Sequence, residues 1–125
     1  MLRKLAYLAV FGILGTLARY WLTGAVQRLA GSGFPWGTWA VNILGCFLFG
    51  LVWVLAEERS LISGEMRVFI LVGFMGAFTT FSTYIFESAQ IAVDAQWMRL
   101  GINLIGQNMA GFAAFILGMT LGRAL

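Results

Sequence analysis

The chain has 125 residues, of which 61% are hydrophobic and only 10% are charged, with a formal net charge of +3. Soluble domains carry about a quarter charged residues, so this composition, with a mean hydropathy of +0.89, excludes a soluble protein and predicts a membrane protein. The lack of histidine and the single cysteine exclude a histidine metal site and an internal disulfide, and we attribute the small positive charge to topology rather than to nucleic-acid binding.

Four segments are long enough to cross a bilayer, which requires about 20 mostly apolar residues. They cover roughly residues 5–26, 36–56, 68–93 and 100–121, and short connections join them. The first segment follows a Met-Leu-Arg-Lys start, but its length and the three similar segments after it indicate a retained helix rather than a signal peptide. We therefore expect one all-α domain over residues 1–125, with four transmembrane helices.

The charged residues give a weak topology signal. Four spans place both termini on one side of the membrane, together with Arg3, Lys4, Arg59, Arg67 and Arg123, and leave Arg28 and Arg99 on the other side. The positive-inside rule then favours a cytoplasmic N-terminus. Because this bias is small, insertion in both orientations stays open. We expect a multi-pass protein of the inner (plasma) membrane.

Two charges lie deep in the predicted spans. Arg19 is about eight residues from the end of the first span, or roughly 12 Å along the helix axis. A buried arginine costs at least about 2.5–3.5 kcal/mol. Arg19 therefore either faces a wet vestibule that handles anions or extends to the lipid headgroups. Glu87 lies similarly deep in the third span, where it could pair with Arg19, accept a hydrogen bond or carry a proton.

Polar side chains recur on the second and fourth spans. Thr38 and Asn42 are one helical turn apart and share a face. The Asn42 amide could donate hydrogen bonds to an anion or simply link two helices, and Gln107 and Asn108 pose the same alternative. The fourth span also has small residues at steps of four, a spacing that lets helices approach closely: Ala110, Ala114, Gly118 and Gly122.

The third span contains the most unusual stretch, from Gly73 to Glu87, with two glycines and an unbroken polar-aromatic run. Backbone leaves the regular helix at membrane depth only where protein or a water-filled cavity satisfies its freed N–H and C=O groups. We predict an interruption between Gly73 and Thr80 that exposes backbone carbonyls. The alternative is a continuous helix whose small residues pack against its neighbours.

Two aromatic rings follow this predicted interruption. Phe81 and Tyr84 are three residues apart on one helical face, with the hydroxyls of Ser82 and Thr83 between them. An aromatic ring has a negative face and a positive edge, so ring edges in a cavity could contact a small anion without binding it tightly. An aromatic pair at this spacing is more often part of a core than of a pore lining.

These residues together resemble the Fluc (CrcB) family of fluoride channels over the whole chain. The run from Gly73 to Tyr84 followed by Glu87, the stretch from Pro35 to Asn42 and, more weakly, Ala18 to Tyr20 carry the resemblance. The resemblance implies a passive, fluoride-selective channel that exports fluoride and relieves its toxicity. It also implies an antiparallel, dual-topology homodimer with two pores and a structural sodium ion at its centre.

The resemblance further implies roles for individual residues. The backbone carbonyls of Gly76 and Thr79 would hold the sodium ion, and Arg19 and Glu87 would be vestibule or supporting residues. The predicted pore lining consists of Phe81, Tyr84, Asn42, Ser82, Thr83, Thr38 and Asn108. The sequence departs from the family pattern at Tyr84, where phenylalanine is usual, and at Phe112, where the polar track of the fourth helix often has serine.

Two other classes remain as alternatives. Small multidrug transporters, which are proton-coupled exporters, are also four-helix antiparallel dimers, but they need a titrating carboxylate in the first helix. Here the first helix has Arg19 and no acid, and Glu87 is the only deep carboxylate. A non-transporting scaffold leaves Arg19 and Asn42 unexplained. We found no nucleophile–base pair or phosphate-binding glycine loop that would indicate an enzyme, and we expect as partners a second copy, fluoride and lipid.

Overall fold

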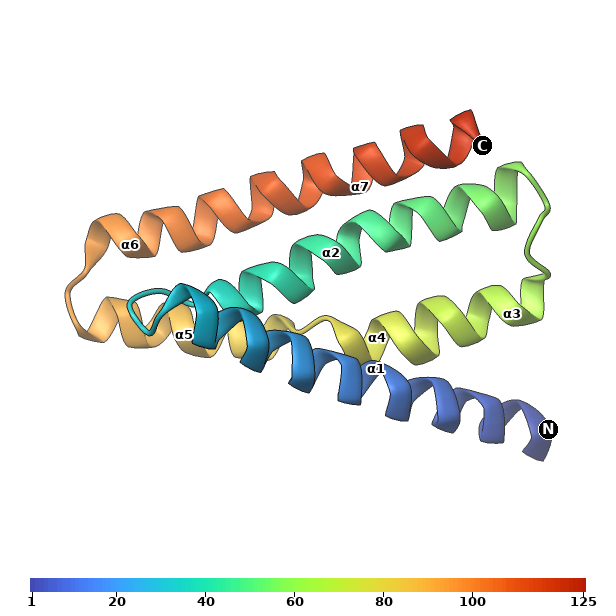
Figure 1. The fold of residues 1–125 in the computed structure, drawn as a ribbon, viewed down its shortest axis with the longest axis horizontal. Coiled ribbons are helices and arrows are strands. Elements are labelled where there is room, and N and C mark those ends of the chain that lie inside the picture. The colour runs from blue at the N-terminus through green and yellow to red at the C-terminus, as the bar shows by residue number, and fades with distance from the viewer.

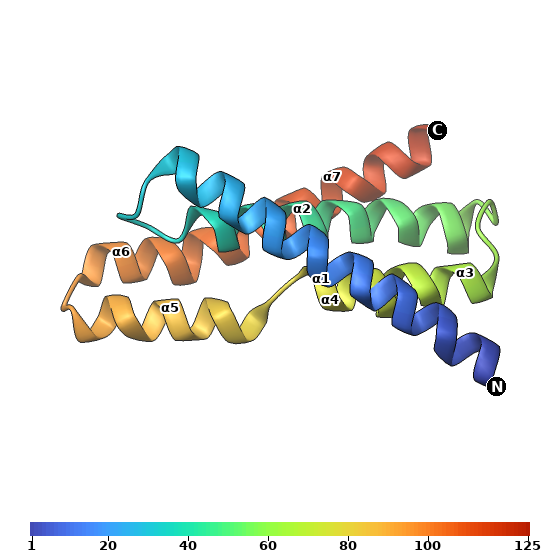
Figure 2. The ribbon, with the colours of Figure 1, turned by 60° about the horizontal axis from the view of Figure 1, so that its bottom comes forward.

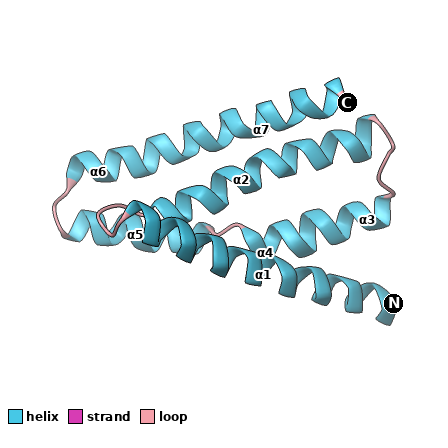
Figure 3. Cartoon of the chain, viewed as in Figure 1, coloured by secondary structure: helices cyan, strands magenta, loops and turns pink.

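The computed structural model describes residues 1–125, almost all of them helical (Figure 1, Figure 3). The first long helix is α1 (Leu2–Ala30). The second is α2 (Trp36–Trp53), which continues through the π-helical turn η1 (Val54–Glu58). The third consists of α3 (Gly64–Val68), the π-helical η2 (Phe69–Met75), α4 (Gly76–Phe78) and α5 (Phe81–Val93). The fourth consists of α6 (Trp97–Gly101), the π-helical η3 (Ile102–Gly106) and α7 (Gln107–Ala124).

Each of these four helices is long and apolar enough to cross a membrane, so the predicted all-α fold with four spans is confirmed. The helices extend beyond the predicted spans: the first reaches from Leu2 to Ala30 and the third begins at Gly64. The extra turns carry charged side chains that pair across helices, such as Lys4 with Glu65 at 2.7 Å. Helical hydrogen bonding therefore continues past the end of each apolar stretch.

Both termini lie at one end of the molecule, together with the connection between η1 and α3 (Figure 1, Figure 2). All three ion pairs join segments at this end: Lys4–Glu65, Arg67–Glu57 and Arg123–Glu58. These pairs are largely exposed, so they are screened by solvent and contribute little to stability. They mark this end as the charged end of the bundle, whereas the opposite end carries the turns that follow α1 and α5.

The most extensive helix contact joins α2 and α7, which run side by side. The buried residues of α7 include Ala114, Gly118 and Gly122, so the predicted small-residue stripe does form a packing face, although Ala110 is only half-buried. A Cβ atom at Gly118 would overlap the Phe47 carbonyl oxygen. Only glycine therefore lets the two backbones touch here.

Large apolar side chains point mostly outward. The buried apolar core is small and lies between α2 and the third helix, where Val41, Leu71, Met75 and Phe78 pack together. Helix α1 buries only Gly15, and most of its leucines and aromatic rings are exposed. Such a wide apolar surface indicates contact with lipid or with another chain rather than with water.

The third helix changes its backbone conformation between α4 and α5 (Figure 2). Thr79 and Thr80 are extended, with φ/ψ of −84°/161° and −148°/109°. The glycines that were expected to mark the interruption, Gly73 and Gly76, both lie in helical backbone. At Gly73 the reason is packing, because a Cβ atom there would lie 2.9 Å from the Cβ of Phe11 on α1.

The packing of α2 against α7 predicts a specific destabilisation by Gly118→Ala. The added methyl group would meet the Phe47 carbonyl, and overpacking of this kind costs about 1–3 kcal/mol. The matched control is Gly101→Ala, because nothing lies within 4 Å of a Cβ atom at this helical glycine. Thermal unfolding in detergent should show a lower midpoint for Gly118→Ala than for the control. Equal midpoints would contradict the backbone contact.

Candidate functional site

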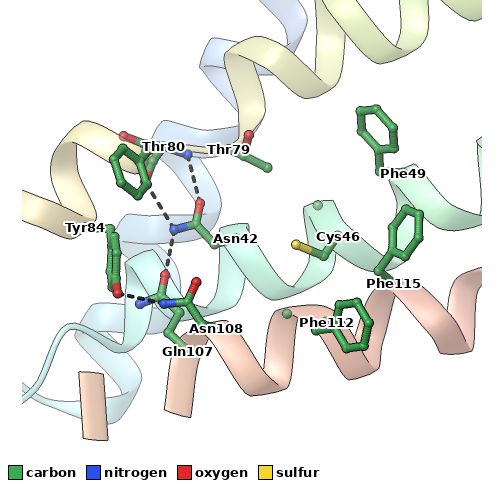
Figure 4. Close-up of a pocket in the computed structure, with 13 residues that line it drawn as sticks. Asn42, Cys46, Phe49, Thr79, Thr80, Tyr84, Gln107, Asn108, Phe112 and Phe115 are labelled. Atoms are coloured by element: carbon green, nitrogen blue, oxygen red, sulfur yellow. Dashed lines mark hydrogen bonds between the residues drawn. The ribbon is translucent and has the colours of Figure 1, made fainter. Parts of the chain in front are cut away.

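A partly open cavity of about 490 Å³ lies beside the junction of α4 and α5 (Figure 4). Side chains from α2, α5 and α7 and the two extended threonines form its wall. The lining residues are Asn42, Gly45, Cys46, Phe49, Thr79, Thr80, Phe81, Tyr84, Gln107, Asn108, Gly111, Phe112 and Phe115. The wall therefore combines neutral amides and hydroxyls with aromatic rings, and it contains no carboxylate.

Asn42 on α2 holds the backbone of Thr80 through two hydrogen bonds (Figure 4). The Thr80 N–H donates to Asn42 Oδ1 at 2.8 Å, and Asn42 Nδ2 donates to the Thr80 carbonyl at 3.1 Å. Because an N–H group can only donate, the atom of Asn42 that faces the Thr80 N–H must be the amide oxygen, and the amide nitrogen then faces the Thr80 carbonyl. Both polar groups of a buried, extended residue are thus satisfied by one side chain.

These bonds explain why two backbone carbonyls are released from the helix. In a continuous α-helix the Thr80 N–H would donate to the Gly76 carbonyl, but here it donates to Asn42. The Thr83 N–H would likewise donate to the Thr79 carbonyl, but it donates to Thr80 Oγ1 at 3.3 Å, so Thr80 is the N-cap of α5. The carbonyls of Gly76 and Thr79 consequently lose their helical partners.

Arg19 lies at this junction. Its Nη1 donates to the Thr79 carbonyl at 3.3 Å, and the side chain is half-buried. The possible pairing of Arg19 with Glu87 is not formed. Glu87 Oε1 instead accepts a hydrogen bond from Thr38 at 2.8 Å, and Glu87 Oε2 is buried without a partner. The two deep charges therefore contact different parts of the bundle.

Tyr84 and Asn108 connect α5 to the fourth helix. The rings of Phe81 and Tyr84 have centroids 5.7 Å apart and are tilted by 47°. The Tyr84 hydroxyl donates to the Leu104 carbonyl at 3.2 Å and accepts from Asn108 Nδ2 at 2.9 Å. The hydroxyl that distinguishes Tyr84 from the phenylalanine of the family pattern thus bonds η3. Phe81, by contrast, is 74% exposed.

The structure brings together four of the seven predicted pore residues: Asn42, Phe81, Tyr84 and Asn108. Thr38, Ser82 and Thr83 lie outside the cavity of this chain. Thr38 is buried and bonds Glu87, Thr83 Oγ1 accepts from Thr80 Oγ1 at 2.9 Å, and Ser82 is exposed on α5. Phe112, the second departure from the family pattern, does line the cavity.

Sequence reasoning missed Thr80 and much of the cavity wall. Thr80 provides a backbone N–H, a carbonyl and a capping hydroxyl at the junction, yet nothing in its immediate sequence distinguishes it from Thr79. The residues that α2 contributes to the wall could have been predicted from their spacing in the sequence. Gly45, Cys46 and Phe49 follow Asn42 at helical spacings of three, four and seven residues, and therefore share its face.

The fold and this cavity define a small multi-pass membrane protein with a polar and aromatic cavity beside an irregular helix junction. The family model described as "CrcB-like protein, Camphor Resistance (CrcB)" matches residues 6–119. The chain therefore belongs to the CrcB family, as the resemblance of its motifs had indicated.

Individual relatives match over the full length of the chain. The chain is 56% identical to the "Fluoride-specific ion channel FluC" of Nitrosococcus oceani and 55% identical to the protein of the same name from Solidesulfovibrio magneticus. A third relative of that name, from Desulforapulum autotrophicum, is 50% identical. Each alignment covers 100% of both chains. These relatives carry the name of an ion channel and not of an enzyme.

The hydrogen bonds of Asn42 predict that Asn42→Leu is strongly destabilising. The substitution leaves two buried groups of Thr80 without partners, at about 1–3 kcal/mol each. Asn108→Leu is the matched control, because its partners Tyr84 and Leu104 remain bonded to each other. Thermal unfolding in detergent should rank Asn42→Leu well below Asn108→Leu. The reverse order would show that Asn42 does not hold the junction.

Proposed function

We propose that this protein is a passive, fluoride-selective channel of the inner membrane that exports fluoride and relieves its toxicity. The observation that carries the proposal is the cavity beside Thr79 and Thr80, whose wall of amides, hydroxyls and rings contains no carboxylate to repel an anion. The likeness to full-length relatives named as fluoride-specific channels supports it.

Fluoride would lose part of its hydration shell inside the cavity. Bare burial of an ion costs tens of kcal/mol in an ideal low dielectric, so protein groups must replace the lost water. The wall offers polar groups that include the Gln107 amide, and the positive edges of Phe81 and Tyr84 provide weak contacts beside it. Weak contacts favour conduction, because an ion must leave each position as easily as it enters.

We further propose that the pore is completed by a second copy in an antiparallel, dual-topology homodimer. In one chain the cavity is partly open, and both Phe81 and Gly76 are exposed. Ser82 and Thr83 are also exposed on α5, so a partner facing α5 would enclose their hydroxyls together with the Phe81 ring. Two such chains would form two pores. The weak charge bias between the ends of the bundle supports insertion in both orientations.

The carbonyls of Gly76 and Thr79 fit a structural sodium ion between the two chains. Both have lost their helical partners, and backbone carbonyls are ligands that replace the hydration shell of alkali ions. A bound cation would supply positive charge that lowers the cost of an anion at membrane depth. Arg19, which donates to the Thr79 carbonyl, adds positive charge at the same place. Thr38 and Glu87 form a supporting pair outside the cavity.

A proton-coupled exporter is the second candidate, and one observation weighs against it. Such a mechanism needs a carboxylate that alternates between proton and substrate, and the cavity wall has none. Glu87, the deep carboxylate, bonds Thr38 outside the cavity.

Fluoride efflux from reconstituted vesicles tests the proposed function. With a voltage gradient and equal pH on both sides, wild-type protein should release fluoride rapidly, and Phe81→Ile should slow efflux strongly because isoleucine keeps the bulk but lacks the ring quadrupole. Phe86→Ile is the matched control, since Phe86 is also exposed on α5 but does not line the cavity. Efflux that requires a proton gradient would favour the exporter, and wild-type rates in folded Phe81→Ile would exclude the ring from the path.

Replacement of sodium by a large organic cation tests the cation site without measuring transport. A bound ion stabilises the folded state by about 2.7 kcal/mol at a hundred times its dissociation constant, so sodium should raise the thermal midpoint of the purified protein. Thr79→Ser should keep this effect, because the ligand is a backbone carbonyl. A midpoint that is identical in sodium and in N-methylglucamine would contradict the site.

A further inference from the structure

A chain of side-chain hydrogen bonds leads from the cavity into the interior of the bundle. Asn42 Nδ2 donates to Gln107 Oε1 at 2.7 Å, Gln107 Nε2 donates to Asn103 Oδ1 at 3.3 Å, and Asn103 Nδ2 donates to Ser88 Oγ at 2.9 Å. Asn103 is fully buried and Gln107 is 6% exposed. Buried amides in a membrane protein need partners, and each of these amides has found them in the others.

The hydrogen bonds at the two ends of this side-chain series fix the orientation of every amide in it. The Thr80 N–H, which can only donate, faces Asn42 Oδ1 at one end. At the other end the Trp39 Nε1–H, also only a donor, faces Asn103 Oδ1 at 2.7 Å. Rotating the Gln107 amide by half a turn would place nitrogen against the Asn42 nitrogen and oxygen against the Asn103 oxygen. Gln107 therefore has a single orientation.

Gln107 differs from the other polar residues of the cavity wall in having an amide hydrogen that is not bonded to protein. Asn42 and Asn108 each give both of their amide hydrogens to protein groups. The hydroxyls of Thr79, Thr80 and Tyr84 each donate inward as well. Gln107 gives only one of its two amide hydrogens, to Asn103. Among the amides and hydroxyls that line the cavity, Gln107 thus keeps an uncommitted donor.

We propose that Gln107 is the amide donor that the cavity presents to the passing anion, and that Asn103 and Trp39 are positioning residues that hold its orientation. The proposal rests on the fluoride-channel function. It also gives Asn42 a different role from the one expected from sequence. Because both Asn42 N–H groups are bound within the protein, Asn42 supports the junction and orients Gln107.

A donor with one fixed orientation suits an ion that must pass quickly. The N–H is already aligned when the anion arrives, so no reorganisation of the amide is needed at that moment. A neutral amide carries no net charge, so it replaces a water of hydration without trapping the ion. The bonds to Asn103 and Asn42 hold the alignment from two sides.

The variant Gln107→Glu tests the donor. Its side chain has the same shape and still accepts from Asn42, but an ionised carboxylate presents only acceptors to the anion. At neutral pH fluoride efflux should fall by about tenfold or more, the effect of losing one hydrogen bond to an ion. Lowering the pH to about 4 should restore much of the efflux, because a carboxyl with the ordinary glutamate pKa of about 4.3 is then more than half protonated and can again donate. Wild-type efflux, corrected for protein-free vesicles, should stay flat over this range.

The variant Trp39→Phe tests the positioning without altering the cavity wall. It removes the N–H that holds Asn103, so the fluoride concentration for half-maximal flux should rise severalfold while the maximal flux is retained. Trp36→Phe is the matched control, because Trp36 belongs to the same aromatic cluster, with ring centroids 5.8 Å apart, but makes no side-chain hydrogen bond.

The outcomes separate this proposal from the function on which it rests. A pH-independent loss of flux in Gln107→Glu would indicate a merely structural role and overturn the assignment, as would identical concentration dependence in Trp39→Phe and Trp36→Phe. The tryptophan pair decides the question even if Gln107→Glu fails to fold. An absence of fluoride flux in the wild-type protein would instead overturn the channel function and this assignment with it.

Discussion

The structure depends on the two hydrogen bonds between the Asn42 amide and the Thr80 backbone. Without them, extended backbone in the middle of a membrane-spanning helix would leave a buried N–H and a buried C=O unsatisfied. With them, α5 begins at a capped residue, and the carbonyls of Gly76 and Thr79 are released from helical bonding. One side chain on a neighbouring helix thereby creates the irregular backbone that the proposed channel needs.

The close approach of α2 and α7 makes this arrangement possible. Asparagine and glutamine side chains are short, so Asn42 can reach Gln107 only if the two helices nearly touch. Gly50 and Gly118 permit that contact, since a Cβ atom on either would overlap a carbonyl oxygen of the facing helix. The small residues of α7 therefore act on the cavity indirectly, by setting the distance between the helices that carry its amides.

The sequence predicts the outline of the fold well, because four apolar segments of this length are stable mainly as membrane-spanning helices. Family resemblance also identified Asn42, Phe81, Tyr84 and Asn108, which the structure brings to one cavity. The interruption was predicted to begin at Gly73, but Gly73 lies in helical backbone. A glycine looks the same in sequence whether it breaks a helix or permits a close contact. Thr80 and Gln107 both bond Asn42, which lies far away in the chain, and no local pattern records these contacts.

The proposed channel requires the third helix to leave helical geometry at Thr79 and Thr80 in the membrane. Solid-state NMR of the labelled protein in lipid bilayers tests it most directly, through the backbone carbon chemical shifts of residues 76–83. The structure predicts extended shifts at Thr79 and Thr80, flanked by helical shifts at Phe78 and Phe81. Uniformly helical shifts from Val68 to Val93 would contradict the account.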